Sequence, residues 1–209
     1  TGKSYLINLI VQRYLKSRNI QVCALTGVAS ELLGCNAKTI HSWAGIGLFN
    51  NNINKIIKGV IYNKKYSTNW KKVDILIIDE VSMMSLELFE LLDKIAREIR
   101  CKDKPFGGIQ LIFSGDFYQL PPVSDNSFEY KFCFESQYWK ETLPNVIILK
   151  QIYRQQDPIF MKILRQVRKG KISQNTLNIL NKRVMNKNNN LSYGKKLNPT
   201  IISPLKSVV

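Results

Sequence analysis

Two adjacent carboxylates at the end of an apolar run constrain this chain more than any other feature. Asp79 and Glu80 directly follow residues 73–78, which read Val-Asp-Ile-Leu-Ile-Ile. A buried strand of this kind delivers both side chains to one edge of a sheet, where the first can hold hydrated Mg²⁺ and the second can activate a water molecule. The pattern predicts a site for phosphoryl transfer at the end of a strand.

The start of the chain supplies the other half of such a site. Thr1, Gly2, Lys3 and Ser4 precede an apolar helical stretch, and the ammonium and hydroxyl groups suit phosphate charge and the same metal. Alone this is weak evidence, because it matches only the end of a phosphate-loop pattern whose first glycine would precede Thr1. Paired with Asp79, these residues predict a nucleotide-binding set for ATP, in which Ser4 and Asp79 hold Mg²⁺.

The charge balance indicates the class of partner. The chain has 31 Lys and Arg against 15 Asp and Glu, a net charge of +16, and such a surplus attracts polyanions, nucleic acid first among them. A solvated basic surface is an equally weighted alternative.

No apolar stretch approaches the ~20 residues of a membrane span, and no signal-like segment opens the chain. The four scattered cysteines form no Cys-x-x-Cys pair, which favours reduced thiols over zinc or disulfides.

Hydrophobic periodicity predicts an α/β fold. Helices are expected over residues 4–17, from Ser85 onward, and from Asp157 to Gly170; strands are expected over residues 20–26, 73–79, 109–115 and 146–150. Because the strands alternate with helices, the sheet should be parallel. The carboxyl ends of its strands should then bring the start of the chain, Asp79 and Glu80 together. Residues 50–72 and 186–190 are polar and are expected to be a surface excursion and a loop.

A nine-residue segment narrows the interpretation to a family. Gly115–Val123 reads Gly-Asp-Phe-Tyr-Gln-Leu-Pro-Pro-Val and resembles the third helicase motif of superfamily one. Residues 26–30, 39–47 and 93–110 are similar to strand-contacting and signature segments of the petite-integration-frequency (PIF) type DNA helicases. The order and spacing of the resemblance hold from Thr1 to about Gly170.

The resemblance implies a role for each polar residue of the predicted ATP site. Lys3 would contact the β and γ phosphates and Glu80 would polarise the attacking water. Gln119 would sense the γ-phosphate, with a simple turn residue as the alternative. Arg154 would be an arginine finger from the next domain, because a planar guanidinium matches phosphate oxygens; a surface ion pair is the alternative.

The resemblance also implies contacts to single-stranded DNA, which requires backbone donors, cations and stackable faces. The implied residues are Thr26, Gly27, His41, Ser42, Phe117 and Pro122. A lone histidine is more often a capped or core residue, and Phe117 could equally be a core aromatic. For the neighbouring Trp43 we prefer the core interpretation.

The implied fold is a RecA-like P-loop NTPase, with a parallel sheet flanked by helices and truncated at both ends. Residues 1–148 would form the first motor domain and residues 149–209 the start of the second. The implied function is an ATP-dependent DNA helicase. It would move five-prime to three-prime on single-stranded DNA and at forks, as a monomeric motor, in repair, recombination or telomere maintenance, in the nucleus or mitochondrion or in a virus.

Two other interpretations stay open. One is a catalytically inactive helicase remnant that still binds single-stranded DNA. The other is a P-loop ATPase of another class, such as a clamp-loader-type remodeller. The intact set of catalytic residue types disfavours the first, and the segment Gly115–Val123 disfavours the second.

Overall fold

The structure is a computed structural model that describes residues 2–47, 52–123 and 130–184. Its helices and strands, in chain order, are α1 (Lys3–Tyr14), β1 (Ile20–Ala24), α2 (Gly27–Leu33), β2 (Lys38–Thr39), α3 (Ile40–Ala44), α4 (Ile53–Tyr62), α5 (Lys64–Lys72), β3 (Ile75–Asp79), α6 (Leu86–Arg100), β4 (Gln110–Phe113), α7 (Trp139–Thr142), α8 (Pro158–Arg168) and α9 (Gln174–Asn181). Short 3₁₀ helices cover Val81–Met83, Pro105–Gly108 and Cys133–Glu135.

The four described strands form one parallel sheet in the order β2-β1-β3-β4. Ala24 pairs with Asp79, and Ile78 pairs with Phe113. The register therefore brings the carboxyl ends of β1, β3 and β4 to one edge, as the alternation of strands and helices predicts. The predicted α/β class and parallel sheet are confirmed.

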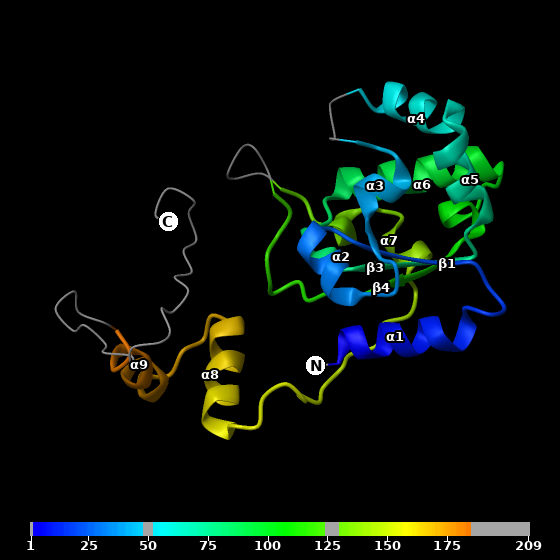
Figure 1. Cartoon of the computed structure of the whole chain (residues 1–209). Coiled ribbons are helices and arrows are strands. Elements are labelled where there is room, and N and C mark those ends of the chain that lie inside the picture. The colour runs from blue at the N-terminus through cyan, green and yellow to red at the C-terminus, as the bar shows by residue number, and fades with distance from the viewer. Residues whose placement is uncertain (1, 48–51, 124–129, 185–209) are drawn as a thin grey trace, which may run out of the picture. The chain divides into compact units, whose positions relative to one another are not determined.

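Helices cover both faces of the sheet (Figure 1). Alternate β-strand side chains point to opposite faces, so Ile75 and Ile77 of β3 pack with α1, while Leu76 and Ile78 belong to the larger core on the side of α3, α4, α5 and α6. Each fully buried aliphatic side chain contributes roughly 1.5–3 kcal/mol to folding. The all-buried strand β3 is thus the centre of the fold.

Helix α6, which follows Asp79 and Glu80, has the N-cap and the buried apolar stripe that its sequence predicts. The Ser85 side chain accepts a hydrogen bond from the backbone N–H of Leu88, a side-chain N-cap. The apolar stripe of α6 is buried against the sheet, with Leu92 and Ile95 fully covered. This helix fixes the direction in which the chain leaves β3.

Two expectations differ from the structure. Residues 50–72 are not only a surface excursion, because α4 and α5 bury Ile57, Val60 and Trp70 in the core; residues 50 and 51 lie outside the described part. The strand predicted over Val146–Lys150 was wrong. Those residues form no β-pairing, and Val146, Ile147 and Ile148 are 74–83% exposed. An apolar run becomes a strand only where a neighbouring strand satisfies its backbone groups.

The chain divides into two compact units, Thr1–Met161 and Lys162–Val209. In the second, α9 begins at a Ser173 side chain that accepts from the backbone N–H of Thr176. Assignment of residues 149–209 to a second motor domain stays a prediction, and residues 186–190 lie outside the described part. Among the described helices, none is long and apolar enough to span a membrane.

Candidate ATP and DNA site

Asp79 and Glu80 occupy different environments although they are adjacent. The Asp79 side chain is buried at the end of β3, 3% exposed, and its Oδ1 has no hydrogen-bond partner among the described residues. Glu80 adopts a left-handed backbone conformation with φ of 56°. That conformation is unfavourable for a residue with a Cβ and concentrates at functional sites. The turn keeps one carboxylate buried and points the next one toward the sheet edge.

Lys3 reaches this edge from the start of α1. Its Nζ lies 3.4 Å from Oε1 of Glu80, and both side chains are partly exposed. Gly2 precedes the helix with φ of 83°, a left-handed conformation that suits glycine. The predicted convergence of the chain start with the carboxylate pair is therefore present. Ser4 is exposed in the first turn of α1, and Thr1 lies outside the described residues.

The segment after β4 closes on the turn that carries Glu80. The backbone N–H of Val81 donates to the carbonyl of Ser114 at 3.1 Å. A Cβ on Gly115 would lie 2.8 Å from Cγ2 of Val81, so only glycine fits there without movement. Beyond it, the backbone N–H of Gln119 donates to the carbonyl of Asp116 in a turn, and Gln119 is exposed.

Four of the six candidate strand-contacting residues lie at two helix starts. Thr26 caps α2 by accepting from the N–H of Ala29, which makes Gly27 the first helical residue. Thr39 caps α3 in the same way through the N–H of Ser42, and His41 follows within that helix. Trp43 is 3% exposed, which confirms the core interpretation.

Burial affects the one histidine of the chain. The imidazole of His41 is half-buried, and this desolvation lowers its pKa below the ordinary value of 6.5. His41 is therefore mostly neutral at pH 7 and can act there as a hydrogen-bonding or stacking group rather than as a cation.

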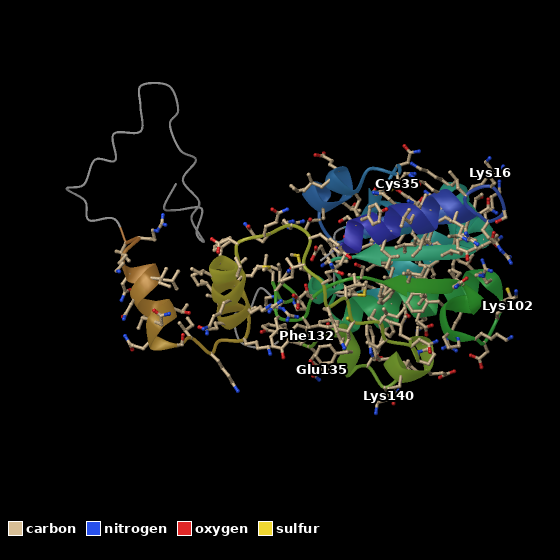
Figure 2. The ribbon with its side chains drawn as sticks, turned by 90° about the horizontal axis from the view of Figure 1, so that it is seen from below. Lys16, Cys35, Lys102, Phe132, Glu135 and Lys140 are labelled. Carbon is tan, nitrogen blue, oxygen red and sulfur yellow. The ribbon has the colours of Figure 1, made fainter. Side chains whose placement is uncertain are left out.

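Phe117 belongs to an aromatic cluster that the sequence did not indicate. Its ring is 37% exposed and meets the rings of Phe132 and Phe134 edge to face, while those two stack on each other at 4.9 Å. Figure 2 shows Phe132 and Glu135 on the side of the sheet away from α1; the Glu135 carboxylate accepts the N–H of Phe132. Pro122 is buried, unlike the exposed contact expected of it.

Arg154 is exposed and lies at a bend in the irregular segment between α7 and α8. Tyr153, next to it, places its ring 3.9 Å from where a Cβ on Gly2 would be, so this segment passes the start of α1. The catalytic and DNA-contacting roles assigned to these residues stay predictions.

The oxygen atoms available around Asp79 fit a Mg²⁺ ion that is bound together with a phosphate. Among the described residues no group of three or more His, Cys, Asp or Glu is arranged to hold a metal alone. Mg²⁺ commonly uses one or two protein oxygens and fills the remaining positions with phosphate oxygens and water. The unpaired buried oxygen of Asp79 suits that arrangement. The Oγ of Ser82, in the turn that follows Asp79 and Glu80, is 1% exposed and also has no hydrogen-bond partner in the described part; sequence analysis did not single it out.

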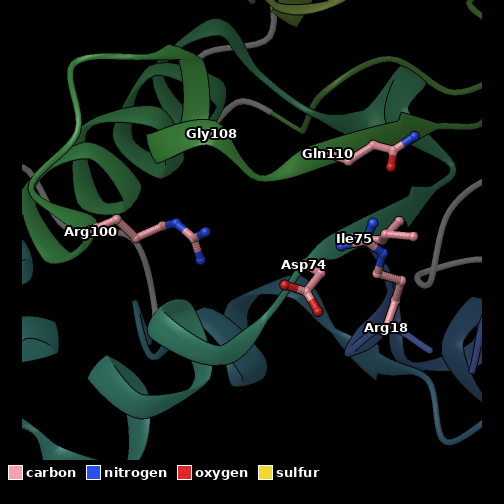
Figure 3. Close-up of a pocket in the computed structure, with 6 residues that line it drawn as sticks. All are labelled: Arg18, Asp74, Ile75, Arg100, Gly108 and Gln110. Atoms are coloured by element: carbon pink, nitrogen blue, oxygen red, sulfur yellow. The ribbon is translucent and has the colours of Figure 1, made fainter. Parts of the chain in front are cut away.

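A polar pocket lies at the opposite edge of the sheet. Figure 3 shows its lining, which includes the first residues of β3 and β4, Ile75 and Gln110, with Arg18 and Arg100. The Arg100 guanidinium donates to the carbonyls of Trp70, Lys71, Val73 and Gly107. Arg100 thus joins α5, α6 and the loop before β4, which is a structural role.

Comparison with known proteins identifies strong relatives over most of the chain. Residues 1–178 match the profile of the family described as PIF1-like helicase. The ATP-dependent DNA helicase RRM3 of Saccharomyces cerevisiae is 40% identical over 206 residues, which are 96% of this chain and 28% of that protein.

Solved structures agree in fold. The crystal structure of Pif1 helicase from Candida albicans superposes with a TM-score of 0.81 at 40% identity, over 87% of this chain and 41% of that one. Pif1 helicase from Bacteroides in complex with ADP-AlF3 and ssDNA gives a TM-score of 0.72 at 27% identity, over 86% of this chain and 42% of that one. The chain spans less than half the length of these relatives.

Proposed function

This chain belongs to the PIF1-like helicase family, and from that premise we propose that it is the ATP-binding part of an ATP-dependent DNA helicase. The full-length protein would couple ATP hydrolysis to movement along single-stranded DNA and to separation of a duplex. A relative of known structure was solved with a nucleotide analogue and single-stranded DNA, which supports both ligands for this chain.

One observation carries the proposal. The ammonium of Lys3 lies against Glu80, at the edge where a buried oxygen of Asp79 has no partner among the described residues. A phosphate-binding cation, a candidate base and a candidate metal ligand thus come from the start of α1 and the end of β3. Those are the protein groups that ATP hydrolysis requires.

Each residue would have a defined part in the reaction. Lys3 would leave Glu80 for the β and γ phosphates, and Glu80 would then accept a proton from the attacking water. Asp79 and Ser4 would hold Mg²⁺, which neutralises phosphate charge when bound. Gln119 and Arg154 would reach the γ-phosphate as the motor closes.

DNA would bind along the two capped helix starts, at Thr26, Gly27, His41 and Ser42, and at Phe117. Neutral donors and an aromatic face suit sequence-tolerant contact with single strands. Because Pro122 is buried, we assign it the support of this segment as well as the predicted contact. Five-prime to three-prime direction, action at forks, monomeric operation, the repair, recombination or telomere pathway and the nuclear or mitochondrial compartment stay predictions from the family resemblance.

The test uses the full-length protein. We expect ATP turnover that rises on addition of single-stranded DNA, and ATP-dependent unwinding of a duplex with a five-prime tail but not of one with a three-prime tail. Binding of DNA without any ATP turnover would instead favour the inactive remnant. Turnover indifferent to DNA would favour a P-loop ATPase of another class.

A further inference from the structure

Helices α4 and α5 carry a concentration of positive charge that the ATP site does not explain. Residues 53–72 contain six lysines and no aspartate or glutamate. All six side chains are exposed, and none of them forms an ion pair with a carboxylate among the described residues. We call these residues the lysine face: Lys55, Lys58, Lys64, Lys65, Lys71 and Lys72.

The lysines lie opposite the buried sides of their helices. At 100° per residue, Lys55 and Lys58 point away from Ile57 and Val60, which are in the core. In α5 the buried residue is Trp70, and its four lysines lie on the remaining sides. The two helices thus use one side to hold the fold and present cations on the other.

Helix α5 holds α3, which carries His41 and Ser42. The Nδ2 of Asn69 donates to the carbonyl of Trp43 at 3.1 Å, and the indole Nε1 of Trp70 donates to the carbonyl of Ala44 at 3.2 Å. These bonds satisfy the free carbonyls at the end of α3. The rings of Trp43 and Trp70 also meet at 4.7 Å. The lysines on α5 are therefore anchored to the helix that carries the candidate strand contact, and those on α4 follow because α4 packs against α5.

Helix α8 also carries Lys162, Arg165 and Arg168 without an acidic residue, but the helix that packs beside α4 and α5 differs. The neighbouring helix α6 mixes both signs: Glu87, Glu90, Asp93 and Glu98 oppose Lys94, Arg97 and Arg100. Like charges that crowd two short helices destabilise them slightly, so a partner of opposite charge is the physical complement. Phosphates spaced along nucleic acid provide it.

We propose that the lysine face binds the phosphate backbone of the DNA segment that flanks the strand held at α3. This rests on the proposed function, because it assumes that DNA lies at α3. The contacts are electrostatic and independent of sequence. The flanking segment can be a longer single strand or the duplex arm of a fork, and the experiment separates these sources.

The test measures DNA affinity of the full-length protein against salt. The variant carries Lys58→Gln, Lys64→Gln and Lys71→Gln, and glutamine keeps helix propensity. The matched control neutralises Lys94, Lys102 and Lys104, which are exposed on or just after α6. Three DNAs are compared: an oligonucleotide of about eight nucleotides, a single strand of about thirty, and the short strand joined to a duplex.

The variant should bind the short oligonucleotide like the parent. On the DNA that reaches the lysine face, its plot of log K against log salt should become shallower by roughly 2–3, since each duplex phosphate contact contributes about 0.9 and each single-strand contact about 0.7. If the slope falls on the long single strand and not on the joined duplex, the flanking segment is single-stranded DNA. If it falls on the joined duplex and not on the long single strand, the flanking segment is duplex.

Two results would overturn this inference and leave the proposed function standing. One is an unchanged slope on all three DNAs with normal binding of the short oligonucleotide. The other is an equal loss of slope in the α6 control, which would make the effect one of overall charge. A parental protein that binds no single-stranded oligonucleotide would overturn the proposed function, and this inference with it.

Discussion

The ammonium of Lys3 and the carboxylate of Glu80 lie 3.4 Å apart, although 76 residues separate them in the chain. Their side chains are 21% and 30% exposed, and an ion pair in such a solvated position contributes only ~0–1 kcal/mol. It is therefore easily exchanged for a contact between Lys3 and phosphate. We infer that nucleotide binding releases Glu80 at the moment when a base is needed.

Replacement of Glu80 tests that base directly. Glu80→Gln keeps the shape of the side chain but cannot take up the proton of the attacking water. ATP binding should persist, and most DNA-stimulated hydrolysis should be lost, as measured by turnover in the full-length protein. Glu98→Gln, at an exposed position of α6, is the matched control. Parental turnover in Glu80→Gln would remove Glu80 from the mechanism.

The close approach at Gly115 predicts an effect of a single methyl group. Gly115→Ala would place Cβ 2.8 Å from Cγ2 and 3.0 Å from the backbone nitrogen of Val81, so the turn carrying Glu80 must shift. We expect a fall of tenfold or more in ATP turnover, in line with the sensitivity of catalysis to misplacement of about 1 Å.

Gly59→Ala is the control for that prediction. Gly59 lies inside α4, and nothing is within 4 Å of the added Cβ. Alanine favours the helix by about 1 kcal/mol over glycine, so turnover should be unchanged and the unfolding midpoint in urea should rise. Equal turnover in both alanine variants would show that the Gly115 contact does not position Glu80.

Sequence was sufficient for the parts of the fold that local pattern decides. The buried strand before Asp79, the N-cap at Ser85 and the parallel sheet follow from apolar runs, capping chemistry and alternation of elements. The meeting of Lys3 with Glu80 also follows, because parallel strands share one carboxyl edge.

The remaining features depend on distant partners. Residues 146–150 have strand-like composition, but pairing requires a neighbour that the local sequence does not reveal. Trp70 is buried by contact with Trp43, so the Asn/Lys-rich stretch around it conceals two helices. The stacking of Phe132 and Phe134 beside Phe117 likewise arises only from the tertiary path of the chain.

Asp93 links α6 to the loop before β4, and its loss should destabilise the fold. Its Oδ1 accepts from the N–H of Phe106 at 2.6 Å and its Oδ2 from Nε of Arg97 at 2.7 Å. Asp93→Ala leaves a buried N–H unpaired, which costs about 1–3 kcal/mol. The unfolding midpoint in urea should fall clearly. Asp103→Ala, which removes the fully exposed second partner of Arg97, should leave that midpoint unchanged; equal effects would contradict the prediction.

His41 predicts how DNA binding depends on pH and salt. Because desolvation lowers the pKa of His41 below 6.5, the ring is mostly uncharged from pH 7 to pH 8. His41→Gln should therefore weaken binding of single-stranded DNA without changing the slope of log K against log salt, which reports cationic contacts. A shallower slope for His41→Gln at pH 7.5 would mean that the imidazole is charged on DNA.

The sign of the pH effect on stability follows from the same shift. Since the folded state disfavours protonated His41, its neutral form contributes stability above about pH 6.5, and this contribution is lost as the pH falls through the lowered pKa. His41→Gln should flatten that part of the stability profile. Urea unfolding midpoints between pH 5 and pH 8 provide the measurement.

Arg154 distinguishes a two-domain motor from a single nucleotide-binding domain. It is exposed at a bend in the segment that follows α7, and it precedes α8, whose start is capped by Asp157. A side chain on such a connection can approach the γ-phosphate when the domains of the full-length protein close, so hydrolysis would be coupled to closure. Arg154→Ala should leave nucleotide affinity within a few-fold, because Lys3 remains, yet reduce hydrolysis by ~10³ or more.

The variant Arg154→Lys separates the effect of charge from the effect of side-chain geometry at this position. Arg154→Lys keeps the positive charge but loses the planar fork that binds two phosphate oxygens, so it should restore little activity. ATP turnover at saturating single-stranded DNA measures both variants, with Arg165→Ala on α8 as the control cation. If Arg154→Ala turns over ATP at the parental rate, Arg154 is a surface cation and closure lacks this trigger. If only Arg154→Lys is active, a point charge is enough and the bidentate contact is wrong.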